Sequence, residues 1–199
     1  MRRLGCALAL FFRVVTVAAA HPHVFVDAAF ELEFSGGIPD SIRVRWRFDD
    51  FFSRMILVDF AGTATGPLSE AQIEQLRVGA FENLSHYGFF TAILIDDEEL
   101  EITSTRNFSA AVDQRALVYT FTIPLAQPGG PSEGRIAESR QVVIGTYDES
   151  FYTYLDFAVE PIMYTGNYPS GVRYELKERP EHTYYFDLIV PEMLHIRWD

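Results

Sequence analysis

Two histidines and an aspartate near the start of the chain have the spacing of a metal site. His21 and His23 are separated by one residue, so in an extended strand both imidazoles project to the same side, about 6.6 Å apart. Asp27 continues that side. If the chain is cleaved after Ala20, the freed α-amine offers a third nitrogen. Its ordinary pKa of about 7.7 to 8.0 means that metal affinity should rise with pH.

Pro22 narrows the kind of chelate that this terminus can form. The planar copper or nickel mode needs deprotonated backbone amides at the second and third residues, and proline has no N–H. The remaining donors are imidazole, amine and a carboxylate. This set suits zinc, copper or nickel and does not indicate which of the three metals binds. The α-amine with the ring of His21 would be the brace chelate of some copper proteins. The alternative is that His21 and His23 belong to a mobile polar terminus, because two histidines are few ligands and chain ends are usually mobile.

Three familiar enzyme motifs are missing from the sequence, namely G-x-G-x-x-G, G-x-x-x-x-G-K and H-E-x-x-H. The four consecutive acids at 96–99 lie in a tight connection and are typical of a solvated turn. We therefore expect a protein that is not an enzyme.

The first twenty residues have the pattern of a secretory signal peptide. Arg2 and Arg3 precede an apolar run over 4–17 that is interrupted by Arg13, and three alanines end the segment. The run is too short and too interrupted to form a stable membrane-spanning helix. We expect a signal peptide at 1–20 and a single β-rich periplasmic domain at 21–199 that does not itself span a membrane after processing.

Composition excludes several classes of protein and of binding site. A chain of 199 residues that is 48% hydrophobic and 15% aromatic indicates a folded globular protein. Its single cysteine, Cys6, lies in the expected signal peptide, so the mature chain could form neither a disulfide nor a thiolate metal site. The formal net charge of -12 would become -15, because the removed segment holds three arginines and no acid. Such an acidic chain repels phosphates, so no nucleic-acid partner is expected.

Alternating apolar residues predict the hairpin that should position this terminus. Apolar residues alternate over 24–34 and again over 42–48, where Arg43, Arg45 and Arg47 take the outward positions. A hairpin places acids of the first strand beside arginines of the second.

Two helices should follow this hairpin before the chain returns to strands. Asp49 is a candidate cap for a short helix that fades near Phe60, and Ser69 with Gln72 has the capping-box pattern of a longer helix that stops at Gly88. A loop rich in proline and glycine is expected at 127–134, and further strands at 89–95, 100–105, 108–112, 116–124, 141–147, 152–159, 174–176 and 183–190. The pattern predicts an α+β fold, mainly antiparallel and sandwich-like, with one long and one short helix inserted after the first hairpin.

Four segments give the chain a resemblance to a known family. They cover 21–27, 44–52, 81–84 together with 87–91, and 147–152. Together they resemble domain of unknown function family 1007, whose members are loosely described as periplasmic components of ABC-type transport systems and whose genes often accompany nickel/cobalt-type metal transporters. The resemblance implies a periplasmic accessory of metal transport with a membrane transporter as its partner. Asp148 lies in the last of these segments, in a turn that could face the terminus, and becomes a further candidate ligand.

The resemblance also raises the question of calcium. Many relatives carry an EF-hand-like loop at the place of Ala61 to Gln72. Gly66 and Leu68 keep its turn glycine and apolar position, but the positions of the oxygen ligands lack carboxylates, being Ala61, Thr63, Thr65 and Gln72. No calcium is expected.

We therefore favour a periplasmic accessory protein of metal-ion transport that binds a transition-metal ion (zinc, copper or nickel). Its candidate ligands are His21 and His23, with Asp27 and Asp148 as possible helpers. One alternative is the solute-binding component of an ABC importer, although such proteins usually have two α/β lobes around a cleft and this chain is short and β-rich. A brace-type copper redox enzyme is a remote third possibility, supported by nothing beyond the terminus.

Overall fold

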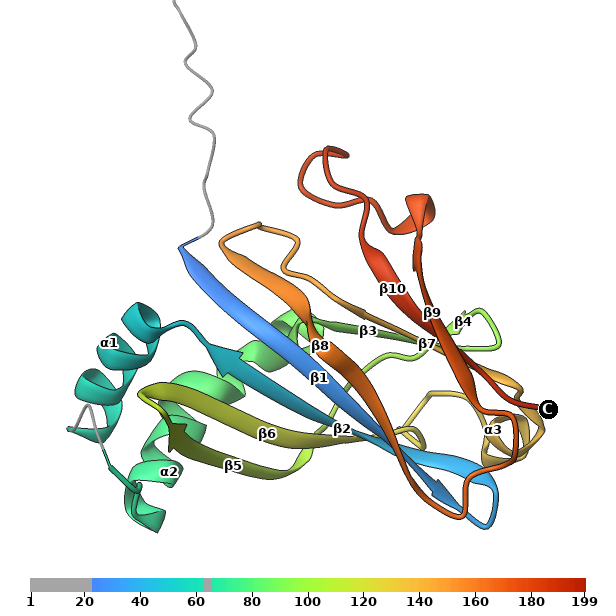
Figure 1. Cartoon of the computed structure of the whole chain (residues 1–199), viewed down its shortest axis with the longest axis horizontal. Helices are drawn as coiled ribbons and strands as arrows, with labels where there is room; N and C mark the ends of the chain where they lie inside the picture. The colour runs from blue at the N-terminus through green and yellow to red at the C-terminus, as the bar shows by residue number, and fades with distance from the viewer. Residues whose placement is uncertain (1–22, 63–65) are drawn as a thin grey trace, which may run out of the picture.

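The computed structural model of the protein describes residues 23–62 and 66–199, which form two packed five-stranded sheets (Figure 1). The first sheet contains, in spatial order, β5 (Arg106–Asp113), β6 (Ala116–Pro124), β2 (Ile38–Phe48), β1 (Val24–Ser35) and β8 (Thr153–Gly166). The second contains β4 (Glu98–Glu99), β3 (Thr91–Ile95), β7 (Gln141–Thr146), β10 (Glu192–Arg197) and β9 (Arg173–Glu178). The predicted α+β class with a mainly antiparallel, sandwich-like arrangement is confirmed.

The predicted hairpin is formed by β1 and β2. Their antiparallel register places Glu31 opposite Arg43 and Asp27 opposite Arg47. The Glu31 carboxylate lies 3.1 Å from the Arg43 guanidinium, so acids and arginines meet on the exposed face as expected. The alternate apolar side chains of both strands are buried beneath that face.

The pairing of β1 with β8 is parallel. Val24 lies opposite Thr153 and Leu32 opposite Tyr164, with an irregularity after Ala28. The predicted strand over 152–159 continues to Gly166, through Pro161. Because β8 is an edge strand, a residue without an N–H is tolerated there.

The two expected helical segments follow the hairpin. α1 (Asp50–Ala61) begins at Asp49, whose carboxylate accepts from the backbone N–H groups of Phe51 and Phe52, both at 2.9 Å. α2 (Glu70–Leu76) begins with the predicted capping box of Ser69 and Gln72.

The long helix is not uniformly α-helical. A π-helical turn, η1 (Arg77–Phe81), follows α2 and leads into η2 (Glu82–Phe90), which kinks at Gly88 with a φ of 55°. Along this segment Leu76 and Phe81 are buried, whereas Ala80 and Leu84 are half-buried.

The prediction of a strand over 100–105 was wrong. The side-chain amide of Gln127 accepts from the Ser104 N–H at 3.1 Å and donates to the Ser104 carbonyl at 2.9 Å. A side chain therefore satisfies backbone groups that a neighbouring strand would otherwise pair.

Two further differences lie toward the carboxyl end. The predicted loop over 127–134 leads into a short helix, α3 (Glu133–Glu138). Residues 183–190 follow the short helix η3 (Pro180–His182) and form a turn closed by a bridge between Tyr184 and Ile189, not a strand. The last strand is β10, whose residues 193–196 are all buried and so lack the alternation that marks a half-buried strand.

The main core lies between the sheets and extends under the helices. Near the β1–β2 turn, Phe34 packs edge-on against Trp198 at the end of the second sheet. At the other end of the same sheet face, Phe48 packs against Phe52 of α1. Within the described residues, no helix is long and apolar enough to cross a membrane.

Candidate functional site

His23 is held at the start of β1. Its backbone N–H donates to the Tyr152 carbonyl at 2.8 Å, and its imidazole lies against the Tyr152 ring with centroids 5.1 Å apart. His23 is an exposed residue. His21, the other predicted imidazole ligand, lies outside the described residues.

Asp27 lies on the same exposed face of β1 as His23, but the two side chains are too far apart to share a metal ion. The two Cα atoms are four residues apart, about 13 Å at the rise of a β-strand. Because both ligand atoms must come within about 2.2 Å of one zinc ion, these side chains are too short to bind it together. The strand register instead places Asp27 between Arg47 of β2 and Asp156 of β8.

The Asp148 carboxylate makes its hydrogen bonds within the turn between β7 and β8. It is 4% exposed, and one carboxylate oxygen accepts from the N–H and hydroxyl of Ser150 at 2.9 and 2.7 Å. The other oxygen accepts from the Thr153 N–H at 2.9 Å. The carboxylate thus fixes the turn that starts β8. Among the described residues, no group of three or more His, Cys, Asp or Glu side chains is arranged to hold a metal ion.

Gln72 ties together the two ends of the segment from Ala61 to Gln72, where the relatives carry an EF-hand-like loop and no calcium is expected here. Its side-chain amide donates to the Ala61 carbonyl at 2.6 Å and accepts from the Ser69 N–H at 2.9 Å. Gln72 therefore acts as a structural link between α1 and α2. Thr63 and Thr65 lie outside the described residues.

A cavity of about 390 Å³ lies between the first sheet and the helices, and we call it the inner cavity. Apolar side chains of the sheet form its floor, among them Val24, Val26 and Trp46, while α1 contributes Phe52 and Ile56. The helical segment from Ala80 to Phe90 forms a further wall, and the volume is within the range of small-molecule sites.

A second, more polar hollow of about 530 Å³ adjoins the inner cavity, and we call it the outer hollow. Four residues line both, namely Tyr87, Phe90, Asp148 and Ser150. The outer hollow adds His86, Glu99 and Glu149. The inner cavity is thus mainly apolar, and the adjoining outer hollow carries acidic side chains.

Trp46 forms part of the floor of the inner cavity. The residue is 1% exposed, and its indole N–H has no hydrogen-bond partner among the described residues. Its ring is held by Phe90, with centroids 6.3 Å apart, and by Phe121, with centroids 5.0 Å apart. The alternation of β2 predicts that Trp46 points inward, but nothing in the sequence signals that the helices leave space above it.

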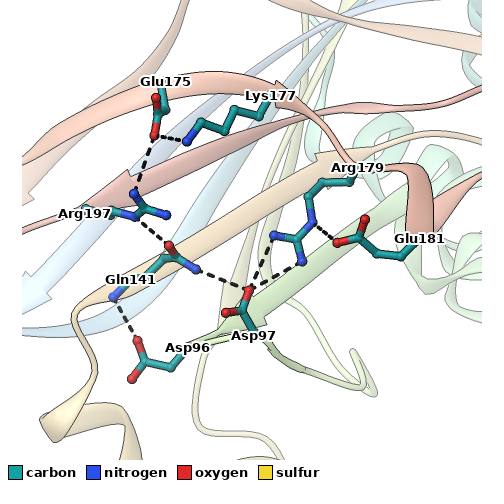
Figure 2. Close-up of polar contacts among 8 residues, drawn as sticks. All are labelled: Asp96, Asp97, Gln141, Glu175, Lys177, Arg179, Glu181 and Arg197. Atoms are coloured by element: carbon teal, nitrogen blue, oxygen red, sulfur yellow. Dashed lines mark hydrogen bonds and ion pairs between the residues drawn. The ribbon is translucent and has the colours of Figure 1, made fainter.

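The outer face of the second sheet carries an extended polar network (Figure 2). Gln141 links Arg197, at 2.7 Å, to Asp97, at 3.4 Å, and Arg179 bridges Asp97 and Glu181. Close to this network, His195 is 4% exposed, and neither ring nitrogen has a hydrogen-bond partner in the described part of the chain. Burial lowers the pKa of His195, and the neighbouring cations lower it further.

The chain belongs to the family described as protein of unknown function (DUF1007), whose model matches residues 6–185. It is also similar to an uncharacterized 15.5 kDa protein in trpE 3'region from Spirochaeta aurantia. The two are 23% identical over 144 residues, which is 72% of this chain and 98% of the relative.

Proposed function

We propose that this chain is a periplasmic accessory protein of metal-ion transport that binds zinc, copper or nickel at its mature amino terminus. The α-amine and imidazole of His21 and the imidazole of His23 would be the ligands. The observation that supports this most is the anchoring of His23 by Tyr152, through a backbone hydrogen bond and a ring contact. A ligand already held in place loses less conformational freedom on binding than one in a mobile terminus.

Charge and sequence give further support. A formal net charge of -12 favours the approach of cations over anions. The signal-peptide pattern at 1–20 supports export, and the family resemblance supports a membrane metal transporter as the partner. Asp27 and Asp148 are left out of the proposed ligand set, because one is too far from His23 and the other is engaged in its own turn.

The proposal is tested by calorimetric titration of the processed protein with Zn²⁺, Cu²⁺ and Ni²⁺. Mass spectrometry first establishes that the protein begins at His21. We expect at least one metal to bind, and we expect His23→Gln to weaken its affinity tenfold or more. A version with one extra residue before His21 should also bind more weakly, because its amine no longer adjoins the His21 ring. The matched control is His86→Gln, which changes an exposed histidine of η2 and should leave affinity unchanged. Equal and negligible heats for all proteins would contradict the proposal.

The alternative of an ABC solute-binding component receives less support. The described residues form two packed, mainly antiparallel sheets, whereas such binders usually have two α/β lobes around a cleft.

A further inference from the structure

The inner cavity and the outer hollow have the properties of a binding site. Along β1, Val24 and Val26 face the inner cavity, whereas His23 and Asp27 lie on the exposed face of the same strand. Tyr152, which anchors His23, also lines the inner cavity, so the cavity has to be changed at its other residues. With such changes the two sites can be tested independently.

The walls of the inner cavity leave apolar surface open to solvent. Phe52, Ile56 and Leu84 line it but are only half-buried, and Tyr87 is 64% exposed. Contact between apolar surface and water is unfavourable, so filling such a recess stabilises the folded chain. The recess thus favours a ligand with an apolar body.

The approach to the cavity sets the charge of the ligand. Asp148, Glu149 and Glu99 line the outer hollow, and the described residues that line the two spaces include no lysine or arginine. Tyr87 and Phe90, whose ring centroids are 5.9 Å apart, stand where the spaces meet. Aromatic faces beside carboxylates attract organic cations, by cation–π and Coulomb interactions.

We infer that the inner cavity and the outer hollow bind a small organic cation. Its apolar body occupies the inner cavity, and its amine or quaternary ammonium group lies between Tyr87 and the acids of the outer hollow.

The experiment compares three probes with the same apolar chain, below the concentrations at which they form micelles. Decyltrimethylammonium, decanol and decanoate are titrated into the processed protein, and binding is followed by calorimetry and by intrinsic fluorescence. We expect decyltrimethylammonium to bind at least tenfold more tightly than decanoate. We also expect Trp46→Phe to remove most of the fluorescence change, since Trp46 lines the cavity and Trp198 does not.

Two variants locate the binding. Ala80→Trp fills the cavity from its helical wall and should weaken decyltrimethylammonium binding tenfold or more, whereas Val78→Trp, at an exposed position of η1, should not. If Ala80→Trp does not fold, the double change Glu99→Gln with Glu149→Gln serves instead. Removing both acids should abolish most of the preference for the cation over decanoate.

Several results would overturn the inference. They are an absence of binding by all three probes, equal affinity for the cation and the anion, or unchanged binding by the cavity-filling variant. A processed protein that elutes as a dimer, and that Ala80→Trp converts to a monomer, would assign the cavity to a second copy of the chain. Binding of Zn²⁺, Cu²⁺ or Ni²⁺ should be the same in all of these variants, so failure here is distinguishable from failure of the metal site.

Discussion

Replacing Asp148 with asparagine distinguishes a structural carboxylate from a metal ligand. An asparagine oxygen can keep both contacts to Ser150, but its NH₂ group would then face the Thr153 N–H. Thr153 is only 8% exposed, so this donor stays buried without an acceptor. A buried unsatisfied group costs about 1 to 3 kcal/mol, and we expect the free energy of unfolding to fall by about 2 kcal/mol.

Urea denaturation at pH 7, followed by circular dichroism, measures this change. Asp148→Ala should cost about 3 to 4 kcal/mol, because the contacts to Ser150 are lost as well. Glu149→Gln is the matched control: it removes the same charge from the exposed neighbouring position and should cost less than about 0.5 kcal/mol. Metal affinity of folded Asp148→Asn should match that of the natural protein. The reasoning is refuted if Asp148→Asn is as stable as the control, or if it folds normally and loses the metal.

Three further predictions concern the scaffold. Burial, together with nearby cations, lowers the pKa of His195 in the folded state, so the unfolded chain binds more protons and stability should fall as the pH drops below about 6.5. His195→Gln should reduce this fall in melting temperature between pH 8 and pH 5, whereas His86→Gln should not. Ser53→Ala should cost about 2 kcal/mol in urea denaturation and speed hydrogen exchange of the Leu117 amide, which now donates to the Ser53 hydroxyl at 2.8 Å; unchanged exchange would contradict this. Gly166→Ala should lower stability by about 2 kcal/mol or more, because φ is 73° and the new Cβ would lie 2.0 Å from a β1 carbonyl oxygen; a variant as stable as the natural protein would rule out this clash.

Local sequence patterns predicted two kinds of feature correctly: strands with one buried face, and helices that begin at a capping residue. The β1–β2 hairpin follows from alternation, because one side of each strand lies on the core and the other meets water. Asp49 and Ser69 mark helix starts because their side chains bond backbone groups two or three residues away. Such signals are contained within a few residues, so they can be read without knowing the fold.

The remaining features depend on parts of the chain that are distant in sequence. β10 is buried on both sides, because Leu194 and Ile196 face the main core while Met193 belongs to a smaller cluster on the other side of the sheet. The anchoring of His23 depends on Tyr152, and the inner cavity depends on how closely α1 and η2 approach the sheet. Residue types and spacings carry no signal for these distances. The metal site therefore remains a prediction from sequence, whereas the cavity is visible only in three dimensions.

The parallel pairing of β1 with β8 has a consequence for the order of folding. Val24 is among the first residues of the sheet to be synthesised, yet its neighbour Thr153 follows it by 129 positions. Contacts between residues so far apart in sequence form slowly, because the entropy cost of closing a long loop comes before any stabilising contact is made. β1, which follows His23, therefore gains its second partner strand only after most of the chain has been synthesised. In fragments that end before β8, β1 would become an unpaired edge strand, although it is an inner strand of the complete sheet, and such an edge favours aggregation.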